Sequence, residues 1–220
     1  MNSKVSVKKI SLIGMFSAMS YIAVLLGDVI PKVSGILSYD PKDAVIAIAG
    51  FLFGPTYTVV ISVLVCLVEM ITVSSTGPIG CLMNVLSTVS FALPAALIYK
   101  KNKSYQGAIV GLFTGVCFMT VVMMLWNYLV TPMYMEVQRE VVVSMLLPVF
   151  LPFNAIKGGL NAALTLLLYK PLVTTLRRAK LVPASHSSDQ NGKFHYSFLV
   201  IALALLAVFA VLFLFLIEVI

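Results

Sequence analysis

Long uninterrupted runs of apolar residues, separated by short polar segments, constrain this chain more than any other feature. The runs that we expect to form helices lie at about residues 10–27, 43–54, 56–72, 80–99, 107–130, 145–170 and 196–217. Only 10% of the 220 residues are charged, whereas a soluble domain carries roughly 25%. Because a bilayer core offers no water to backbone polar groups, spanning segments are helices or closed barrels. The runs show no strand-like alternation, so the sequence predicts an all-α membrane protein of six or seven transmembrane helices.

The second run, 43–54, is short for a membrane span, because crossing a bilayer takes about 20 residues. Gly54 and Pro55 follow it, and proline suits the first turn of a helix. We therefore expect the second and third segments to form a tight hairpin or a broken pair.

The chain divides at one polar, turn-rich stretch, residues 181–195, which we interpret as a linker. Residues 1–180 before it are predicted to form a six-helix substrate-binding membrane domain. Residues 196–220 after it are predicted to form an additional, seventh transmembrane helix. This last helix has no polar face, so we expect it to face lipid and to carry no chemistry.

The positions of the basic residues indicate an orientation. If the amino terminus is cytoplasmic, most basic residues outside the spans lie on the cytoplasmic side: Lys4, Lys8, Lys9, Lys100, Lys101, Lys103, Lys170, Arg177, Arg178, Lys180 and Lys193. Lys32, Lys42 and Arg139 fall on the outer side. Lysine and arginine are enriched in cytoplasmic loops, so this bias predicts a cytoplasmic amino terminus. The two longest loops, about 28–42 and 131–144, then meet an incoming ligand first.

The sequence contains no pattern for nucleotide hydrolysis or nucleophilic catalysis. There is no P-loop, and His186 and His195 lie in or beside the linker, away from the spans. Cys66, Cys81 and Cys117 have no metal-ligand spacing and are read as buried thiols. The basic clusters flank spans and are not interleaved with aromatic residues, which argues against a nucleic-acid partner. We expect no catalysis, no metal and no cofactor.

Polar side chains inside the predicted spans are few, and each is a functional hypothesis, because an ionisable group at the membrane centre costs about 2.5–3.5 kcal/mol on insertion scales. The candidates are Glu69, Asn84, Asn127, Asn154, Lys157 and Asn161. Spacings of three and four place the last three on one helical face. Pro148 and Pro152, one turn earlier, are expected to loosen the start of that helix.

These amides and the ammonium suit a neutral heterocycle with carbonyl and imide edges, because an amide both donates and accepts and an ammonium supplies three donors. We expect Trp126, Tyr128 or Phe153 to stack on such a ring. Asn84 and Asn127 are expected to reach the same outer half of the bundle. The alternative is that the amides only bond helix to helix.

Two further positions have alternative interpretations. Glu69 either contacts the ligand or pairs with Lys157. Asp40, in the sequence Tyr39-Asp-Pro-Lys-Asp43, either caps the second helix or belongs to a loop that closes over a ligand.

Gly14 and Ala18, four residues apart on the first helix, form a small-residue surface that allows close helix approach. This surface serves either packing within the chain or docking of another membrane subunit.

The order of several motifs is more specific than any one of them. They are Tyr39-Asp-Pro-Lys-Asp43, Gly50-Phe-Leu-Phe-Gly-Pro55, Gly77-Pro-Ile-Gly80 with Asn84, Pro94-Ala-Ala-Leu-Ile-Tyr-Lys100, Trp126-Asn-Tyr-Leu-Val-Thr-Pro-Met-Tyr134 and Leu151-Pro-Phe-Asn-Ala-Ile-Lys-Gly158. Over about residues 8–175 this series resembles the riboflavin-specific S components, the substrate-binding membrane subunits of energy-coupling factor (ECF) vitamin importers. The additional carboxy-terminal helix departs from the six-helix pattern of that family, as does Val65-Cys66, where riboflavin members carry a Lys-Asn pair.

The resemblance implies a six-helix bundle with both ends in the cytoplasm of the cell membrane, and a vitamin site that opens outward under the first outer loop. It implies a membrane-embedded coupling subunit and two ATPase subunits as partners, with the first helix as the docking face. Gly14 and Ala18 match the small-residue type of that docking face, although Ile22 breaks its usual spacing.

The hypothesis is therefore non-covalent riboflavin binding and uptake as an S component, with FMN or analogues as alternative ligands. Asn84, Asn127, Asn154 and Lys157 are predicted to bond the ligand, with Trp126 and Phe153 packing on it and Glu69 and Asp40 as further contacts. One alternative is an S component for another small vitamin or nucleobase-like solute. A second is a membrane scaffold without transport activity, whose polar residues only hold helices together.

Overall fold

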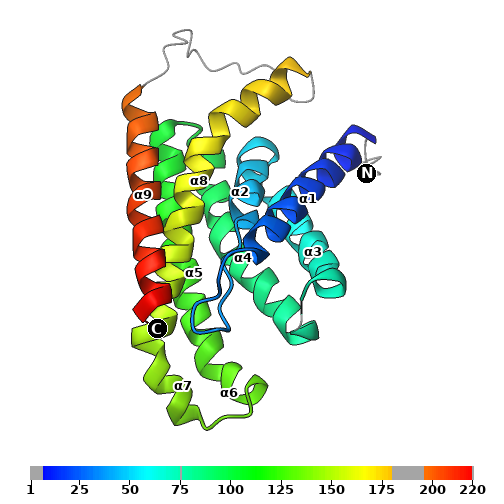
Figure 1. Cartoon of the computed structure of the whole chain (residues 1–220). Coiled ribbons are helices and arrows are strands. Elements are labelled where there is room, and N and C mark those ends of the chain that lie inside the picture. Colours follow the sequence, from blue (N-terminus) through cyan, green and yellow to red (C-terminus); the bar gives the residue numbers. More distant parts are fainter. Residues whose placement is uncertain (1–6, 75, 180–195, 220) are drawn as a thin grey trace.

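The computed structural model describes residues 7–74, 76–179 and 196–219, and the predicted linker with both histidines lies outside these ranges. The described residues form helices and one isolated bridge between Val33 and Leu37, which confirms the all-α prediction (Figure 1). The elements are α1 Val7–Asp28, α2 Lys42–Phe53, α3 Pro55–Thr72, α4 Gly77–Lys101, α5 Tyr105–Leu129, α6 Thr131–Tyr134, α7 Arg139–Met145, the π-helical segment η1 Leu146–Phe150, α8 Leu151–Arg178 and α9 Tyr196–Val219.

Within the described residues, six segments are long and apolar enough to cross a membrane, so the chain is a multi-pass membrane protein. They are Lys9–Asp28, Pro55–Thr72, Gly77–Lys101, Tyr105–Leu129, Arg139–Leu176 and Val200–Glu218. The fifth segment joins α7, η1 and α8 into one continuous path. The π-helical turn of η1 contains Pro148, as expected where a proline disturbs the regular hydrogen-bond ladder.

The predicted second helix is present as α2, but its 12 residues rise only about 18 Å. That is shorter than the roughly 30 Å hydrocarbon core, so α2 does not cross a membrane by itself. It is instead enclosed by α1, α3, α4 and α8, and Ile46 and Ile48 are completely buried. At Gly54 the backbone takes a positive φ of 100°, which lets α2 turn sharply into Pro55 of α3. The predicted tight hairpin is confirmed.

The two ends of the bundle differ in charge and in loop length (Figure 1). We call one the basic end, because it carries the start of α1 with Lys9, the α4–α5 connection with Lys100, Lys101 and Lys103, and the end of α8 with Arg178. We call the other the loop end. It carries the α1–α2 loop at residues 29–41, the α3–α4 connection, and α6 with the segment that follows it.

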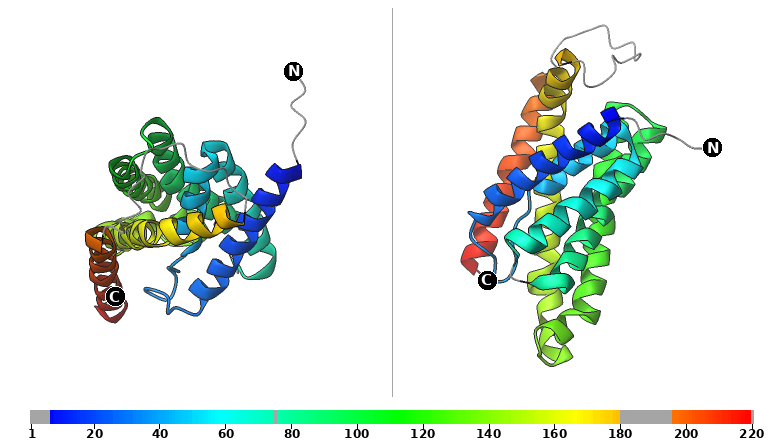
Figure 2. Two further views of the ribbon diagram at one scale, coloured as in Figure 1. Left: turned by 90° about the horizontal axis from the view of Figure 1, so that it is seen from above. Right: turned by 90° about the vertical axis from the view of Figure 1, so that its right-hand side faces the viewer.

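The carboxy-terminal helix α9 runs beside α8 at the edge of the bundle (Figure 2). Ala202, Phe213 and Leu216 on one side of α9 are buried, while Leu214 and Phe215 between them are exposed. The expectation of a lipid-facing helix therefore holds for only part of its circumference.

Two expectations about surface residues need correction. Cys117 was expected to be buried like the other cysteines, but it lies exposed on α5. Gly14 and Ala18 are also exposed, and nothing lies within 4 Å of a side chain built at Gly14. Packing within the chain therefore does not explain the small residues of α1, and their docking role stays a prediction.

Candidate ligand-binding site

Five charged side chains gather inside the loop end of the bundle. Asp40 ends the α1–α2 loop, Lys42 and Asp43 begin α2, Glu69 lies on α3 and Lys157 lies on α8. All five are buried. Three carboxylates therefore share the interior with two ammonium groups. We call this group of five the ion network.

Ion pairs connect the network across three elements. The Lys157 Nζ lies 2.6 Å from the Asp40 Oδ2, and the Lys42 Nζ lies 3.6 Å from the Asp40 Oδ1. The Lys42 Nζ also lies 2.7 Å from the Glu69 Oε2. The alternative that paired Glu69 with Lys157 is therefore wrong, because Lys42 reaches Glu69 and Lys157 is taken by Asp40.

The charge state of Asp40 follows from these contacts. Burial alone raises the pKa of a carboxyl group, but the two ammonium groups of Lys157 and Lys42 favour the anion more strongly and bring the pKa of Asp40 down to about 2. Asp40 is therefore ionised at neutral pH and holds the end of the loop against α8.

The capping interpretation of Asp40 is also wrong. Pro41 occupies the N-cap position of α2 without any side-chain cap, because the Asp40 carboxylate points to the lysines. Asp43, in the first turn of the helix, accepts a hydrogen bond of 2.7 Å from the Thr88 hydroxyl of α4. Its negative charge also suits the positive end of the helix dipole.

Lys42 was placed on the outer surface from the sequence, yet it is 0% exposed. A signal for its burial was present. A lysine in the first turn of a helix opposes the helix dipole, so a lysine there, between two aspartates and before an apolar run, indicates a specific anionic partner.

The predicted shared face of α8 is confirmed, since Asn154, Lys157 and Asn161 are all buried. Asn161 ties α8 to the loop and to α2. Its Nδ2 donates to the Asp40 carbonyl at 3.0 Å and to the Asp43 carboxylate at 3.5 Å. Its Oδ1 accepts from the Tyr39 hydroxyl at 3.2 Å.

The other three amides differ in what they bond. Asn84 donates to Glu69 at 2.8 Å, from α4 to α3. Asn154 and Asn127 instead donate to carbonyls four residues earlier in the chain: Asn154 to Phe150 of the adjoining η1, and Asn127 to Met123 of its own helix, both at 2.8 Å. The Asn127 carbonyl also accepts from the Thr131 hydroxyl at 2.9 Å.

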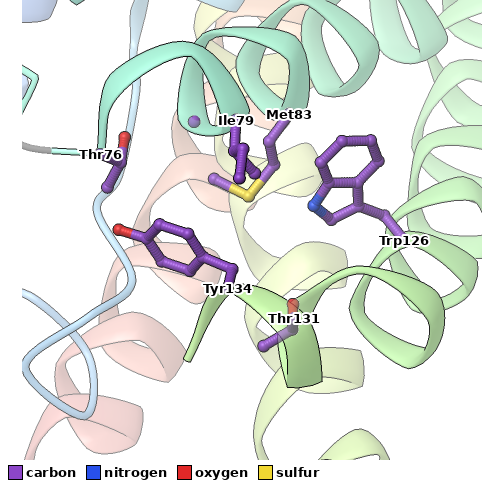
Figure 3. Close-up of a pocket in the computed structure, with 7 residues that line it drawn as sticks. Thr76, Ile79, Met83, Trp126, Thr131 and Tyr134 are labelled. Carbon is purple, nitrogen blue, oxygen red and sulfur yellow. The ribbon is translucent and has the colours of Figure 1, made fainter. Parts of the chain in front are cut away.

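The predicted aromatic contacts are distributed over separate places. Trp126 lines a small cavity between α4, α5 and α6, together with Met83 and Tyr134 (Figure 3). Phe153 lies elsewhere, in an apolar cluster with residues of the α1–α2 loop and α9. Tyr128 is exposed, and its ring is covered by the Arg139 guanidinium at 5.2 Å. It is therefore not placed to stack on a ligand inside the bundle.

The cavity at Trp126 measures about 30 Å³, whereas small-molecule pockets usually measure about 300–1,000 Å³. The close-up shows the side chains of Ile79 and Met83 extending from α4 between the Tyr134 ring and the Trp126 indole. Methionine has three rotatable bonds and fills irregular gaps. A bulky ring can enter this corner only if these side chains or the neighbouring loop move.

Comparison with known proteins agrees with the helical architecture. Residues 8–169 match the family described as ECF transporter, substrate-specific component. The chain is 30% identical over 177 residues to the riboflavin transporter RibU of Staphylococcus aureus (strain TCH60), an alignment that covers 78% of this chain and 93% of that protein. It is 27% identical over 187 residues to the riboflavin transporter FmnP of Bacillus subtilis (strain 168), covering 80% and 98%.

A solved structure supports the same relationship. The S component of a bacterial ECF transporter superposes on this chain with a TM-score of 0.66 at 31% sequence identity. The superposition covers 78% of this chain and 98% of that one.

Proposed function

This chain belongs to the family of ECF transporter substrate-specific components, and from that premise we propose that it binds riboflavin for uptake across the cytoplasmic membrane. Two relatives that match most of this chain are named riboflavin transporters. The observation that carries the proposal is the set of buried amide and ammonium groups that converge at the loop end of a bundle with this family's fold.

We place the loop end outside the cell and the basic end in the cytoplasm. The positive-inside rule supports this, because Lys100, Lys101, Lys103 and Arg178 lie at one end of the bundle. An external ligand then reaches the α1–α2 loop first. The amino terminus is cytoplasmic in this orientation.

The amides of Asn127 and Asn154 are the groups that exchange partners most easily. Each bonds a carbonyl four residues earlier in the chain, and such a carbonyl already accepts a helical hydrogen bond. Turning the amide toward a ligand therefore leaves no buried carbonyl unpaired. We assign these two amides to the polar edges of the flavin ring, with Trp126 packing on its face.

Lys157 and Asn84 reach the ligand at a higher energetic cost, because each is bonded to a carboxylate of another element: Lys157 to Asp40 and Asn84 to Glu69. Lys157 has three donors, of which the carboxylate of Asp40 takes one at 2.6 Å. A ligand carbonyl can accept from another while the ion pair stays closed. We assign an indirect role to Phe153, Glu69 and Asp40, which hold the α1–α2 loop and the lysines in place.

Binding by this chain is non-covalent, and we propose no chemistry on the ligand and no bound cofactor besides the riboflavin that it carries. Membership in the family implies association with an ECF module. We propose that a membrane-embedded coupling subunit docks on α1, with Gly14 and Ala18 in the contact, and that two ATPase subunits complete the transporter. The exposure of both small residues supports this role.

The test is a riboflavin titration of the detergent-purified protein, followed by quenching of flavin fluorescence. We expect saturable binding at sub-micromolar riboflavin and about tenfold weaker binding by Asn154→Ala, which corresponds to about 1.4 kcal/mol. Asn102→Ala, at an exposed asparagine of the basic end, is the matched control and should bind like the parent protein. Absence of quenching at far higher riboflavin, with saturable binding of another vitamin, would contradict the flavin assignment.

A further inference from the structure

The carboxy-terminal helix α9 lies beyond the part of the chain that defines the family, since the family match ends at residue 169. Its position is nevertheless specific. α9 begins near the basic end and ends at the loop end, where its last turns approach the α1–α2 loop at residues 29–41 (Figures 1 and 2).

Side chains from three elements form one apolar cluster there. Its buried members are Val33 and Tyr39 of the loop, Phe153, Ile156 and Leu160 of α8, and Phe213 and Leu216 of α9. Ile30 and Leu37 of the loop pack against the same cluster. The apolar side chains of the loop are therefore packed against α8 and α9, and α9 supplies one wall of the cluster.

Tyr39 joins this apolar cluster to the ion network. Its ring centroid lies 5.6 Å from that of Phe213, and its hydroxyl donates to Asn161 at 3.2 Å. The next residue, Asp40, pairs with Lys157. A displacement of the Tyr39 ring away from α9 therefore also pulls on the carboxylate that holds Lys157.

We propose that α9 is a strap, which keeps the α1–α2 loop closed over the loop end of the bundle, and that Phe213 is the positioning residue through which it acts. Its effect on ligand release rests on the function proposed above. The strap slows the escape of bound riboflavin, because the loop must separate from Phe213 before it can open.

The first experiment measures loop opening without any ligand. Val33→Cys introduces a small thiol at a loop position that is completely buried in the apolar cluster, in a Cys117→Ser background where the remaining cysteines, Cys66 and Cys81, are buried. The rate of maleimide labelling at residue 33 then reports how often the loop opens.

Phe213→Ala should raise this labelling rate on the order of tenfold, from loss of the aromatic contact and its packing. Phe215→Ala is the matched control, since Phe215 lies on the same helix but is 61% exposed, whereas Phe213 is 5% exposed. It should label at the parent rate. Phe213→Leu restores part of the apolar volume, so its labelling rate should fall between those of the parent and Phe213→Ala. This variant also keeps the test valid if the alanine variant misfolds.

The second experiment measures riboflavin release from the same variants by recovery of flavin fluorescence after dilution. The strap predicts that release accelerates in Phe213→Ala in the same proportion as labelling, while Phe215→Ala leaves it unchanged. Equal labelling rates in the parent, Phe213→Ala and Phe215→Ala would overturn the strap whatever the ligand. If the parent protein does not bind riboflavin but Phe213→Ala still labels faster, the flavin assignment fails and the strap stands.

Discussion

The polar groups of the loop end lie in two regions that satisfy their hydrogen bonds in opposite ways. Lys157 and Lys42 of the ion network, and Asn161 beside it, bond across elements, to the α1–α2 loop, α2 and α3. Asn127, next to Trp126 in the sequence, instead bonds along the chain, to the carbonyl of Met123 four residues earlier and to the hydroxyl of Thr131 four residues later. Asn154 on α8 follows the second pattern.

This difference separates groups that hold the bundle together from groups that are free to bind. Removing one member of a buried ion pair leaves an uncompensated charge, which destabilises a protein by about 3–5 kcal/mol. An amide that bonds only residues four positions away can be removed without opening a contact between segments that are distant in the sequence. Asparagine occurs in both groups, so its bonding partner, rather than its residue type, distinguishes the amides that hold the bundle together from those proposed to bind the ligand.

The largest effect is expected at Lys157. Lys157→Met retains the apolar stem but leaves Asp40 with Lys42 alone, at 3.6 Å. We expect a loss of about 3–5 kcal/mol in the free energy of unfolding, measured by chemical denaturation in detergent, together with weaker riboflavin binding. Lys32→Met, at an exposed lysine of the same loop end, is the control and should be neutral. A stability loss below about 1 kcal/mol would mean that the ion pair does not hold the loop.

The second prediction compares two asparagines on one face of α8. Asn161→Ala leaves the Tyr39 hydroxyl and the Asp40 carbonyl without their present partners, so we expect a loss of about 1–2 kcal/mol in the free energy of unfolding. Asn154→Ala breaks only a local bond to the Phe150 carbonyl, four residues earlier in the same helical path, and should lower the free energy of unfolding by less than about 0.6 kcal/mol. Riboflavin affinity should show the opposite order: Asn154→Ala should weaken binding more than Asn161→Ala, since only Asn154 is proposed to bond the flavin. Equal stability losses in the two variants would remove the distinction between the regions.

Much of this arrangement follows from the sequence because hydrophobicity and helical spacing act locally. The apolar runs predicted each long helix, and the spacing of Asn154, Lys157 and Asn161 predicted their common buried face. The Gly-Pro pair between α2 and α3 predicted a tight hairpin or a broken pair, and the backbone turns there with a Gly54 φ of 100°.

The partners of the charged residues were not predictable in the same way. Which lysine meets which carboxylate depends on how α2, α3 and α8 pack, and the separation in sequence between Asp40 and Lys157 gives no local signal. Lys42 was misplaced on the surface because charge counting treats a lysine at a helix start as a loop residue. The packing of α9 against α8 was missed because its apolar face toward α8 looks, in sequence, like the face toward lipid.

The third prediction concerns Asp43, because the ion network holds three carboxylates but only two ammonium groups. Asp43 is bonded by Thr88 and Asn161 but lies in no ion pair among the described residues. Asp43→Asn keeps the shape of the side chain and breaks no ion pair, so we expect a change in the free energy of unfolding within about 1 kcal/mol. Asp40→Asn, with the same chemical change at a doubly paired carboxylate, should be clearly destabilising. If Asp43→Asn were the more harmful of the two, the assignment of the lysines to Asp40 would be wrong.

The smallest effect is expected from mild acid, and its sign follows from the same ion pair. The pKa of Asp40 is about 2 in the folded protein, below the value of about 3.9 for an unfolded chain. A carboxyl group with a depressed pKa stabilises the fold fully above its unfolded pKa, and that stabilisation is lost only as the pH falls toward the folded value. Between pH 8 and pH 5 both states are ionised, so the Asp40 contribution to the free energy of unfolding should stay constant. Unfolding midpoints of the parent and of Asp40→Asn should then differ by the same amount at both pH values. A difference that grows on acidification to pH 5 would show that folding takes up a proton at Asp40, so that Asp40 is protonated in the folded protein at that pH and Lys157 lacks its anion there.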